Sequence, residues 1–273
     1  MAHPGARSTV ARRLRYCGMI GTPSPVAVPV EVAANVVYAG LPYAVMMVSP
    51  GDLEDFATGF SLTEGVARHA TDIRGVRVEP QGDGLLLHVD LVPTALQRHM
   101  ARRRSLHGRT SCGLCGIESI DQLPGAEMPV PAAAPVAAAA IQRALAELDA
   151  HQPLNRLTRG VHAAAWCDAD GSILLAREDV GRHNALDKLI GACLRAGVST
   201  EAGFVLLTSR CSFEMIEKAA IFGAATVVAI SAPTSLAIDR ADALGITLVA
   251  LARPDSALQF GQPQQAFASA AVS

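Results

Sequence analysis

The chain has 273 residues, of which 50% are hydrophobic and 18% charged, and this globular composition excludes a disordered protein. Its formal net charge is -2 and its pI is about 6.4, which excludes the strongly basic balance of a general nucleic-acid-binding protein. No apolar stretch approaches the roughly 18 to 20 residues that a bilayer requires. We therefore expect a cytoplasmic protein with no nucleic-acid partner and no membrane segment.

The N-terminal half is predicted to be a small α+β domain preceded by a tail. Residues 1–16 carry four arginines and are expected to be a basic flexible tail. Residues 17–123 then form the domain, which ends in a loop with two cysteines. Ser49 and Pro50 predict the start of a helix, with Ser49 as its N-cap. The other strands and helices are expected at residues 26–37, 43–48, 76–78, 85–89 and 94–104.

A Pro- and Ala-rich segment, residues 124–135, is predicted to link this domain to a C-terminal α/β domain at residues 136–273. Strand patterns alternate there with helix patterns, which predicts a mostly parallel sheet with helices on its faces. The strands are expected at residues 161–167, 172–177, 204–208, 226–231 and 246–252, and the helices at 184–195, 212–222 and 234–244.

The carboxyl ends of parallel strands meet at one edge of a sheet, where α/β proteins bind their ligands. Four loops are expected at that edge: residues 178–184, 209–211, 232–234 and 253–255. They hold the most polar residues of this half. Three of them lead into a helix, whose first amides can bind an anion. Together they predict a site for an anion of nucleotide size.

At the first junction Asn184 is predicted to cap the following helix, with Asp187 completing a capping box. Arg182 and His183, directly before it, would add donors to the exposed amides, so this junction could bind a phosphate or pyrophosphate group. An ordinary capped helix with surface ion pairs explains the same residues equally well. His162 lies in a strand pattern and is interpreted as a structural histidine.

The second and third junctions repeat this geometry. Their polar residues are Ser209, Arg210, Ser212, Ser231 and Thr234. Ser212 and Thr234 are in capping positions, and Glu214 and Lys218 have the spacing of an i,i+4 ion pair. Lys188 and Lys218 are the only lysines of the chain, either by chance or because an ammonium group is required at both positions.

The motif Cys112-Gly-Leu-Cys115 follows an arginine-rich stretch and allows several interpretations. A zinc site would need two more ligands at suitable spacing, and none follows, so no metal is predicted. A thioredoxin-like dithiol would be expected at a helix N-terminus, whereas the glycines favour a loop. In a sulfur carrier, nearby cations would favour a thiolate that accepts sulfur as a persulfide, and the second thiol would release that sulfur or pass it on. Two incidental cysteines are the remaining alternative.

Six segments resemble, in order, the FdhD-type accessory sulfurtransferases of formate dehydrogenase. They lie at residues 44–65, 112–116, 162–164, 178–188, 209–218 and 231–237. The resemblance extends over about residues 30–256. It implies an α/β fold with a three-layer domain like that of cytidine deaminases, without their zinc site, and a homodimer.

By this resemblance Cys112 would carry a persulfide received from a cysteine desulfurase, and Cys115 would assist. The sulfur would pass to the molybdenum of the bis-molybdopterin guanine dinucleotide cofactor, which formate dehydrogenase needs for activity. The guanine nucleotide arms of this cofactor would bind the carboxyl-edge loops. The residues implied there are Arg182, His183, Asn184, Ser209, Arg210, Ser231, Thr234, Leu251, Ala252, Arg253, Pro254, Asp255 and Ser256.

The last of these loops departs from the family pattern, because Asp255 and Ser256 stand where Gly and Arg are common. Losing a cation and gaining an anion weakens the attraction for phosphate. Two other functions stay open: a chaperone that holds the molybdenum cofactor without covalent chemistry, and a dithiol oxidoreductase. The client enzyme, formate dehydrogenase or another molybdoenzyme, also stays open.

Overall fold

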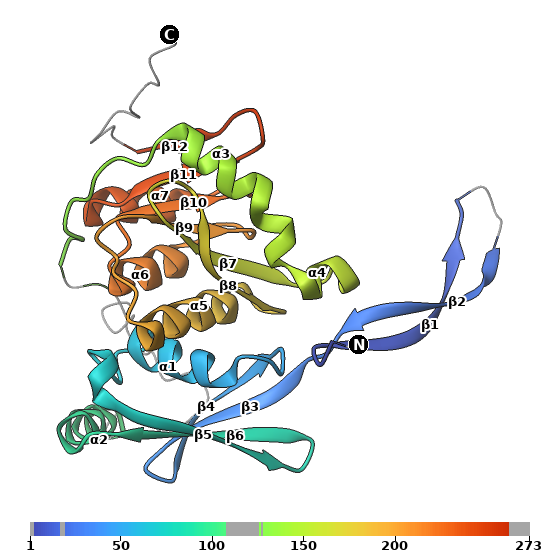
Figure 1. The fold of residues 1–273 in the computed structure, drawn as a ribbon. Coiled ribbons are helices and arrows are strands. Elements are labelled where there is room, and N and C mark those ends of the chain that lie inside the picture. The colour runs from blue at the N-terminus through green and yellow to red at the C-terminus, as the bar shows by residue number, and fades with distance from the viewer. Residues whose placement is uncertain (1–2, 17–19, 108–125, 127, 262–273) are drawn as a thin grey trace.

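The computed structural model describes residues 3–16, 20–107, 126 and 128–261. Their backbone forms three separate sheets of two, four and six strands (Figure 1). The two larger sheets are the bases of two domains, which meet along helices α1 (Leu53–Thr63) and α5 (Arg182–Ala196). No helix in these described ranges is long and apolar enough to cross a bilayer.

The N-terminal domain is built on a four-stranded sheet in the order β4-β3-β6-β5. Its elements are β3 (Val32–Tyr38), β4 (Leu41–Val48), α1, the 3-10 helix η1 (Ala70–Asp72), β5 (Ile73–Gln81), β6 (Gly84–Leu91) and α2 (Pro93–His107). Alternate side chains of β3 and β6 face a core that Phe56 and Phe60 of α1 complete. The predicted N-cap is wrong, because Asp52 and not Ser49 precedes α1.

The C-terminal domain is built on a six-stranded sheet in the order β12-β11-β10-β9-β7-β8. Its strands are β7 (His162–Cys167), β8 (Ile173–Asp179), β9 (Phe204–Leu207), β10 (Thr226–Ala229), β11 (Thr247–Ala250) and β12 (Leu258–Phe260). The expectation of a mostly parallel sheet is wrong. In the part of the chain that the structure describes, β10 pairs parallel with β9 and β11, whereas β7–β8, β7–β9 and β11–β12 are antiparallel. The short connections after β7 and β11 leave no room for the crossover that parallel neighbours need.

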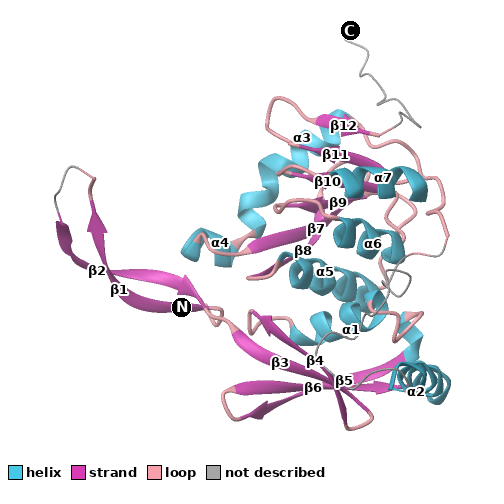
Figure 2. Cartoon of the chain, turned by 180° about the vertical axis from the view of Figure 1, so that it is seen from behind, coloured by secondary structure: helices cyan, strands magenta, loops and turns pink. Residues whose placement is uncertain are grey.

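Helices lie on both faces of this sheet (Figure 2). On one face pack α5, α6 (Phe213–Phe222) and α7 (Ser235–Leu244), and on the other packs α3 (Ala138–Glu147). The 3-10 helix η3 (Leu148–His151) and helix α4 (Pro153–Thr158) then lead into β7. Two apolar clusters fill the spaces above and below the sheet, built mainly from Ala, Val, Leu and Ile.

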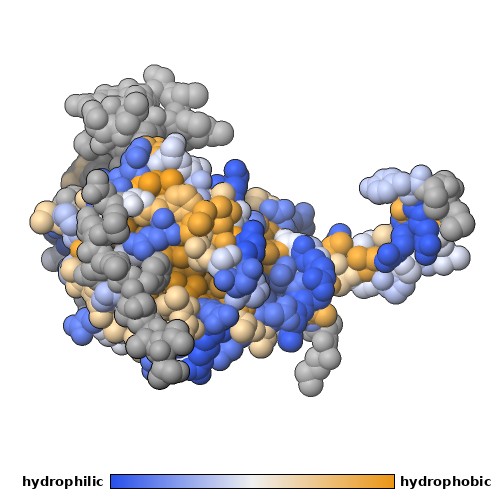
Figure 3. Space-filling model, turned by 90° about the horizontal axis from the view of Figure 1, so that it is seen from above, coloured by the Kyte–Doolittle hydropathy of each residue, from blue (hydrophilic) through white to orange (hydrophobic). Residues whose placement is uncertain are grey.

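A two-stranded ribbon precedes the N-terminal domain, where a flexible tail was expected. β1 (Ala6–Leu14) pairs antiparallel with β2 (Ile20–Pro29), and the ribbon projects clear of the body (Figure 3). The prediction of a tail is wrong because arginine side chains can extend into water from either face of a ribbon, so their charge does not oppose a strand. The Val30 amide donates to the carbonyl oxygen of Gly5 at 2.7 Å and closes the ribbon at its base, where Gly5 lies against Leu154 of α4.

The two domains are held at close range by two glycines on the facing helices α1 and α5. A Cβ on Gly59 would lie 1.9 Å from the carbonyl oxygen of Asp187, and a Cβ on Gly191 would lie 1.9 Å from that of Asp55. Backbones approach this closely only where no side chain intervenes. The contact therefore fixes α5, and the loop in front of it, against the N-terminal domain.

Candidate functional site

The polar loops predicted from the sequence do gather at one edge of the six-stranded sheet. β8, β9, β10 and β11 run in the same direction, because β7 is antiparallel to both β8 and β9. Their carboxyl ends therefore share an edge, on the right of Figure 1, with the start of β7. Four strand spacings separate β8 from β11 along this edge, which is roughly 19 Å. The predicted loops thus form a row and not a single point.

One end of the row is a corner formed by β7, β8, β9 and α5. His162, the first residue of β7, lies opposite Asp179 of β8, so both side chains are on the sheet face that α5 covers. Continuing the β7–β9 register from Ala164 opposite Leu207 places Ser209 on the other side of His162. Arg182 and His183 are the first two residues of α5. The predicted residues Arg182, His183 and Ser209 are therefore brought together here, with His162 between them.

Two donors in this corner lack a protein partner. Arg182 Nε and His183 Nε2 are both buried, and neither has a hydrogen-bond partner among the described residues. Glu214 Oε2 of α6 lies 3.7 Å from His183 Nε2, which is too long for a hydrogen bond. Buried donors without partners are rare in native proteins, and a ligand is one established reason for them. The corner therefore has the properties of an anion site.

The electrostatics of the corner agree with this interpretation. Burial lowers the pKa of His162, and the nearby Arg182 guanidinium lowers it further. Burial and Arg182 lower the pKa of His183 in the same way. The Ser212 hydroxyl, through its hydrogen bond, lowers the pKa of Glu214 and keeps that carboxylate ionised. At neutral pH both histidines are therefore neutral, and Arg182 is the cation that faces the corner.

The middle of the row is more fully occupied by the protein's own contacts. Thr234 caps α7 as predicted, because its hydroxyl accepts a hydrogen bond from Ala237 N at 3.3 Å. Ser209 donates its hydroxyl proton to the carbonyl oxygen of Arg210, at 3.0 Å. Ser231 accepts from Leu251 N through its carbonyl oxygen. Arg210 remains exposed at the end of β9.

The far end of the row is the predicted loop Leu251–Ser256. Leu251 has φ 53, a left-handed conformation that is unfavourable for a residue with a branched side chain. Such strain is concentrated at functional sites in folded proteins. Arg253 donates to the carbonyl oxygens of Ile230 and Ala252, so part of its guanidinium is already used by the backbone. Asp255 and Ser256 are exposed beside it.

Asn184 and Asp187 do not form the capping box that the sequence predicted. α5 begins two residues earlier, with Gly181 as its N-cap, so Asn184 lies inside the first turn. The Asn184 amide is buried and donates to the carbonyl oxygen of Met47 at 2.8 Å and to Asp179 Oδ1 at 3.1 Å. Asn184 therefore joins the two domains, and its side chain is not available to a ligand at the corner.

The two lysines lie in the same seam between the domains. Lys188 Nζ is 2.7 Å from Asp179 Oδ2 and donates to the carbonyl oxygen of Ser49 at 2.9 Å, and both charged side chains are 0% exposed. Ser49 donates its amide to Asp179 and accepts from Val180 N, which is why it is not free to cap α1.

The second lysine corrects another prediction. Lys218 Nζ lies 2.9 Å from Asp187 Oδ1, which also accepts from the Thr63 hydroxyl at 2.7 Å. The expected i,i+4 pair with Glu214 is therefore wrong, since Lys218 points to the seam and Glu214 to the corner. Both ammonium groups are counter-ions for buried carboxylates.

The predicted catalytic residues Cys112 and Cys115 lie outside the described residues, as does Cys17. The other three cysteines are buried, and burial raises the pKa of the Cys167, Cys193 and Cys211 thiols to about 12. Thiols of that pKa are poor nucleophiles at neutral pH. Within the described ranges, no group of three His, Cys, Asp or Glu side chains is placed to hold a metal ion.

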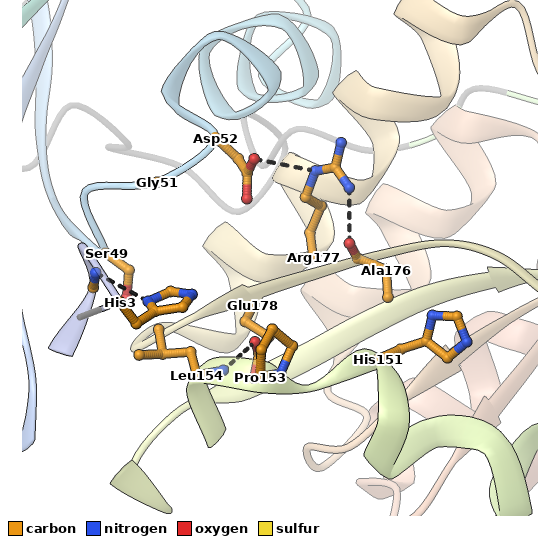
Figure 4. A pocket seen from close by; sticks show the side chains of 11 residues that line it. His3, Ser49, Gly51, Asp52, His151, Pro153, Leu154, Ala176, Arg177 and Glu178 are labelled. Carbon is orange, nitrogen blue, oxygen red and sulfur yellow. Dashed lines mark hydrogen bonds and ion pairs between the residues drawn. The ribbon is translucent and has the colours of Figure 1, made fainter. Parts of the chain in front are cut away.

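A cavity of about 130 Å³ lies elsewhere, where the base of the ribbon, α4 and β8 meet (Figure 4). Its charged groups already have partners. Glu178 accepts from the amides of Leu154 and Asn155, at 2.8 Å each, and Arg177 lies between Asp52 and Asp55. None of the predicted site residues that the structure describes lines it. The edge corner, with its unpartnered donors, is the stronger candidate for a ligand site.

Known proteins match this chain over nearly its whole length. The FdhD/NarQ family matches residues 29–266. The chain belongs to the FdhD/NarQ family. A relative from Cupriavidus necator, named sulfur carrier protein FdhD, is 43% identical over 265 residues, which cover 97% of this chain and 91% of the relative. A protein of the same name from Xanthomonas campestris pv. campestris is 45% identical over 262 residues, which cover 96% and 92%.

The fold has a counterpart among solved structures. The crystal structure of a Desulfotalea psychrophila protein assigned as a formate dehydrogenase accessory protein superposes with a TM-score of 0.74 at 25% identity. The match covers 96% of this chain and 99% of that one. The mixed α/β architecture described above is therefore that of the family.

Proposed function

We propose that this protein is a sulfur carrier that serves a formate dehydrogenase in the cytoplasm. It accepts sulfur from a cysteine desulfurase as a persulfide on Cys112. It then passes the sulfur to the molybdenum of a bis-molybdopterin guanine dinucleotide cofactor bound at the carboxyl edge. The observation that carries the proposal is the pair of buried, unpartnered donors on Arg182 and His183, in a chain whose relatives are named sulfur carriers.

Sulfur transfer through this protein needs two thiols, one to carry the sulfur and one to release it as sulfide. The Cys112 thiolate attacks the outer sulfur of the donor's persulfide, so that a new S–S bond forms while the donor's S–S bond breaks and the donor leaves as a thiolate. Delivery of this sulfur as sulfide requires two electrons. Cys115 supplies them by attacking the inner sulfur of Cys112, which forms a Cys112–Cys115 disulfide and expels the sulfide toward molybdenum. A dithiol reductant then restores both thiols.

The edge would hold the large anionic cofactor across its whole row. Arg182 and His183 at one end and the Leu251–Ser256 loop at the other are separated by about four strand spacings, roughly 19 Å. That distance suits a ligand with two phosphate-bearing arms. Because Asp255 adds a negative charge to the far loop, Arg182 supplies a larger share of the attraction for phosphate. The chain acts as a homodimer in this proposal, as the family resemblance implies.

Mass spectrometry of the intact protein tests the carrier step. After incubation with a cysteine desulfurase and cysteine, the peptide with Cys112 should gain about one sulfur, ~32 Da, and a reducing agent should remove it. Cys112→Ala should gain nothing. Cys115→Ala should still gain the sulfur but should not release it as sulfide. A folded, reduced protein that gains no sulfur on Cys112 would contradict the proposal.

The edge by itself also favours a second function, a cofactor chaperone without covalent chemistry. The unpartnered donors of Arg182 and His183, as found among the described residues, would bind a cofactor without any reaction of Cys112. Activation of a formate dehydrogenase separates the two functions. In the carrier Cys112→Ala abolishes activation, whereas in the chaperone Cys112→Ala activates normally and Arg182→Ala does not.

A further inference from the structure

We propose that His162 completes a phosphate subsite with Arg182 and His183, and that the subsite takes up protons on the two histidines when the phosphate group binds. The inference deepens the proposed function, on which it rests for the identity of the ligand. It reverses the interpretation of His162 as a structural residue. It also adds a property, proton-coupled binding, to the edge.

The geometry places His162 where a third donor is needed. As the first residue of β7, it begins at the edge itself, on the sheet face that α5 covers, and Asp179 lies opposite it in β8. It is half-buried. No hydrogen bond of its side chain is found in the described part of the chain. His162 therefore faces the first turn of α5, where Arg182 Nε and His183 Nε2 have no hydrogen-bond partner in the described ranges.

The start of α5 adds backbone donors to these side chains. Gly181 is the N-cap and provides no side-chain oxygen, and its own amide donates to Asp179 Oδ1 at 2.9 Å. The first four amides of a helix have no intrahelical acceptor, so those of Arg182 and His183 are available. A phosphate group here would meet amides at the positive end of the helix dipole as well as Arg182. The corner thus brings these backbone amides together with two side-chain donors whose hydrogen bonds no described residue satisfies.

The charges around the two histidines explain the proton uptake. His162 is faced by Arg182 and by Asp179, and the charge of Asp179 is balanced by Lys188. In the free protein burial and Arg182 thus keep the pKa of His162 below its ordinary value of 6.5. A phosphate group would add negative charge beside the imidazole, which favours the protonated ring.

The same reasoning applies to His183, which is faced by Arg182, Glu214, Lys218 and Asp187. Lys218 and Asp187 balance one another at 2.9 Å, and Glu214 is partly exposed and 3.7 Å away. Burial and Arg182 therefore dominate, and its pKa is lowered in the free protein. Both histidines should gain protons on binding near neutral pH. By linkage, the affinity for the anion then rises as the pH falls and weakens as it rises.

The first experiment is a histidine side-chain NMR titration of the full-length protein with and without inorganic pyrophosphate. His162→Gln and His183→Gln assign the two signals, and circular dichroism checks that each variant is folded. The pKa of both histidines should lie below the ordinary value without pyrophosphate and should rise when it binds. Adding pyrophosphate should leave the signal of His88, on β6 of the other domain, unchanged. An unchanged pKa of His162 at saturating pyrophosphate, or no binding of pyrophosphate, overturns the inference.

Calorimetry gives the second test. Titrations in buffers of different ionisation enthalpy should show net proton uptake on pyrophosphate binding at pH 7. His162→Gln should reduce that uptake and weaken binding roughly tenfold, because it removes one charge-assisted hydrogen bond. His88→Gln should change neither. Binding without proton uptake, or equal affinities for His162→Gln and His88→Gln, would rule out the role of His162.

These results can be told apart from failure of the proposed function. Persulfide formation on Cys112 is measured separately, without pyrophosphate. A protein that binds pyrophosphate with proton uptake but gains no sulfur would keep the subsite and lose the carrier mechanism. A protein that gains sulfur but shows no change at His162 would keep the carrier mechanism and lose this subsite.

Discussion

The seam between the domains and the corner at the sheet edge lie on either side of Asp179, and both contain buried polar groups. In the seam these groups are matched: Lys188 with Asp179, and Lys218 with Asp187. In the corner Arg182 Nε and His183 Nε2 are buried and have no hydrogen-bond partner among the residues that the structure describes. Burial of a charged group is therefore a poor indicator of function by itself. Unsatisfied hydrogen bonds at the carboxyl edge, where α/β proteins bind their ligands, distinguish the corner from the seam.

The largest effect is expected from breaking the seam. Lys188→Ala leaves the fully buried carboxylate of Asp179 without its counter-ion, and such a change costs roughly 3–5 kcal/mol of unfolding free energy. Chemical denaturation followed by circular dichroism measures this loss. The double variant Lys188→Met with Asp179→Leu, which removes both charges, should recover part of it. A Lys188→Ala protein as stable as the wild type would contradict the assignment of the seam as structural.

A smaller effect is expected where the helices of the seam touch. Gly191→Ala places a Cβ 1.9 Å from the carbonyl oxygen of Asp55, so α1 and α5 must separate. Overpacking of this kind typically costs about 1–3 kcal/mol. Thermal unfolding provides the measurement. Gly75→Ala in β5 is the matched control, because a Cβ there has no neighbour within 4 Å, and it should leave the melting temperature nearly unchanged.

Local signals explain why most elements could be predicted from the sequence. The helices expected at residues 184–195, 212–222 and 234–244 are found at Arg182–Ala196, Phe213–Phe222 and Ser235–Leu244. Each ends at a glycine with positive φ, and an apolar periodicity precedes that glycine. Both features are contained in a few consecutive residues. The edge loops could be predicted as well, because they are the segments that connect each predicted strand to the next helix.

The partners of the polar residues could not be found in this way. The acceptor of Lys188 on Ser49 is 139 residues away in sequence, and Asn184 bonds Met47 across 137 residues. Local spacing suggested a capping box for Asn184, because these groups come together only when the end of β4 packs against α5 in the folded protein.

His162 was missed for a topological reason. In a parallel sheet the start of β7 would lie at the opposite edge, far from the loops. Asp170 and Gly171 have the residue types of a hairpin turn, and β7 is antiparallel to β8. A hairpin reverses the direction of one strand and brings its first residue to the carboxyl edge. That signal was sufficient to place His162 at the site.

Thr234, in the row of edge loops, tests whether a polar group that is already hydrogen-bonded inside the protein has a structural role. The family resemblance placed it among the cofactor-binding residues, yet its hydroxyl already accepts from Ala237 N. Thr234→Ala should therefore lower the unfolding free energy by about 1 kcal/mol, as loss of an N-cap does. Ser212→Ala is the matched control, since the Ser212 hydroxyl bonds the Glu214 carboxylate and does not cap α6. Equal stability of Thr234→Ala and the wild type would show that the cap contributes nothing.

The smallest effect on stability is expected at Arg182, although its effect on binding should be large. Its Nε is buried and no described residue accepts its hydrogen bond, and an unsatisfied buried donor costs about 1–3 kcal/mol of desolvation. Arg182→Gln should therefore change the unfolding free energy by no more than about 0.5 kcal/mol, or raise it. The matched control is Arg240→Gln, because Arg240 pairs with the buried carboxylate of Glu217 and its loss should destabilise the protein.

Denaturation and pyrophosphate binding should be measured on both of these arginine variants. The expected pattern is opposite for the two: Arg182→Gln keeps stability and loses affinity, whereas Arg240→Gln loses stability and keeps affinity. If Arg182→Gln were as destabilised as Arg240→Gln, the Arg182 guanidinium would have a structural partner. The corner would then have a structural role, as the seam has. Retained stability with lost affinity would mean that the fold tolerates an unsatisfied cation at this edge because a ligand satisfies it.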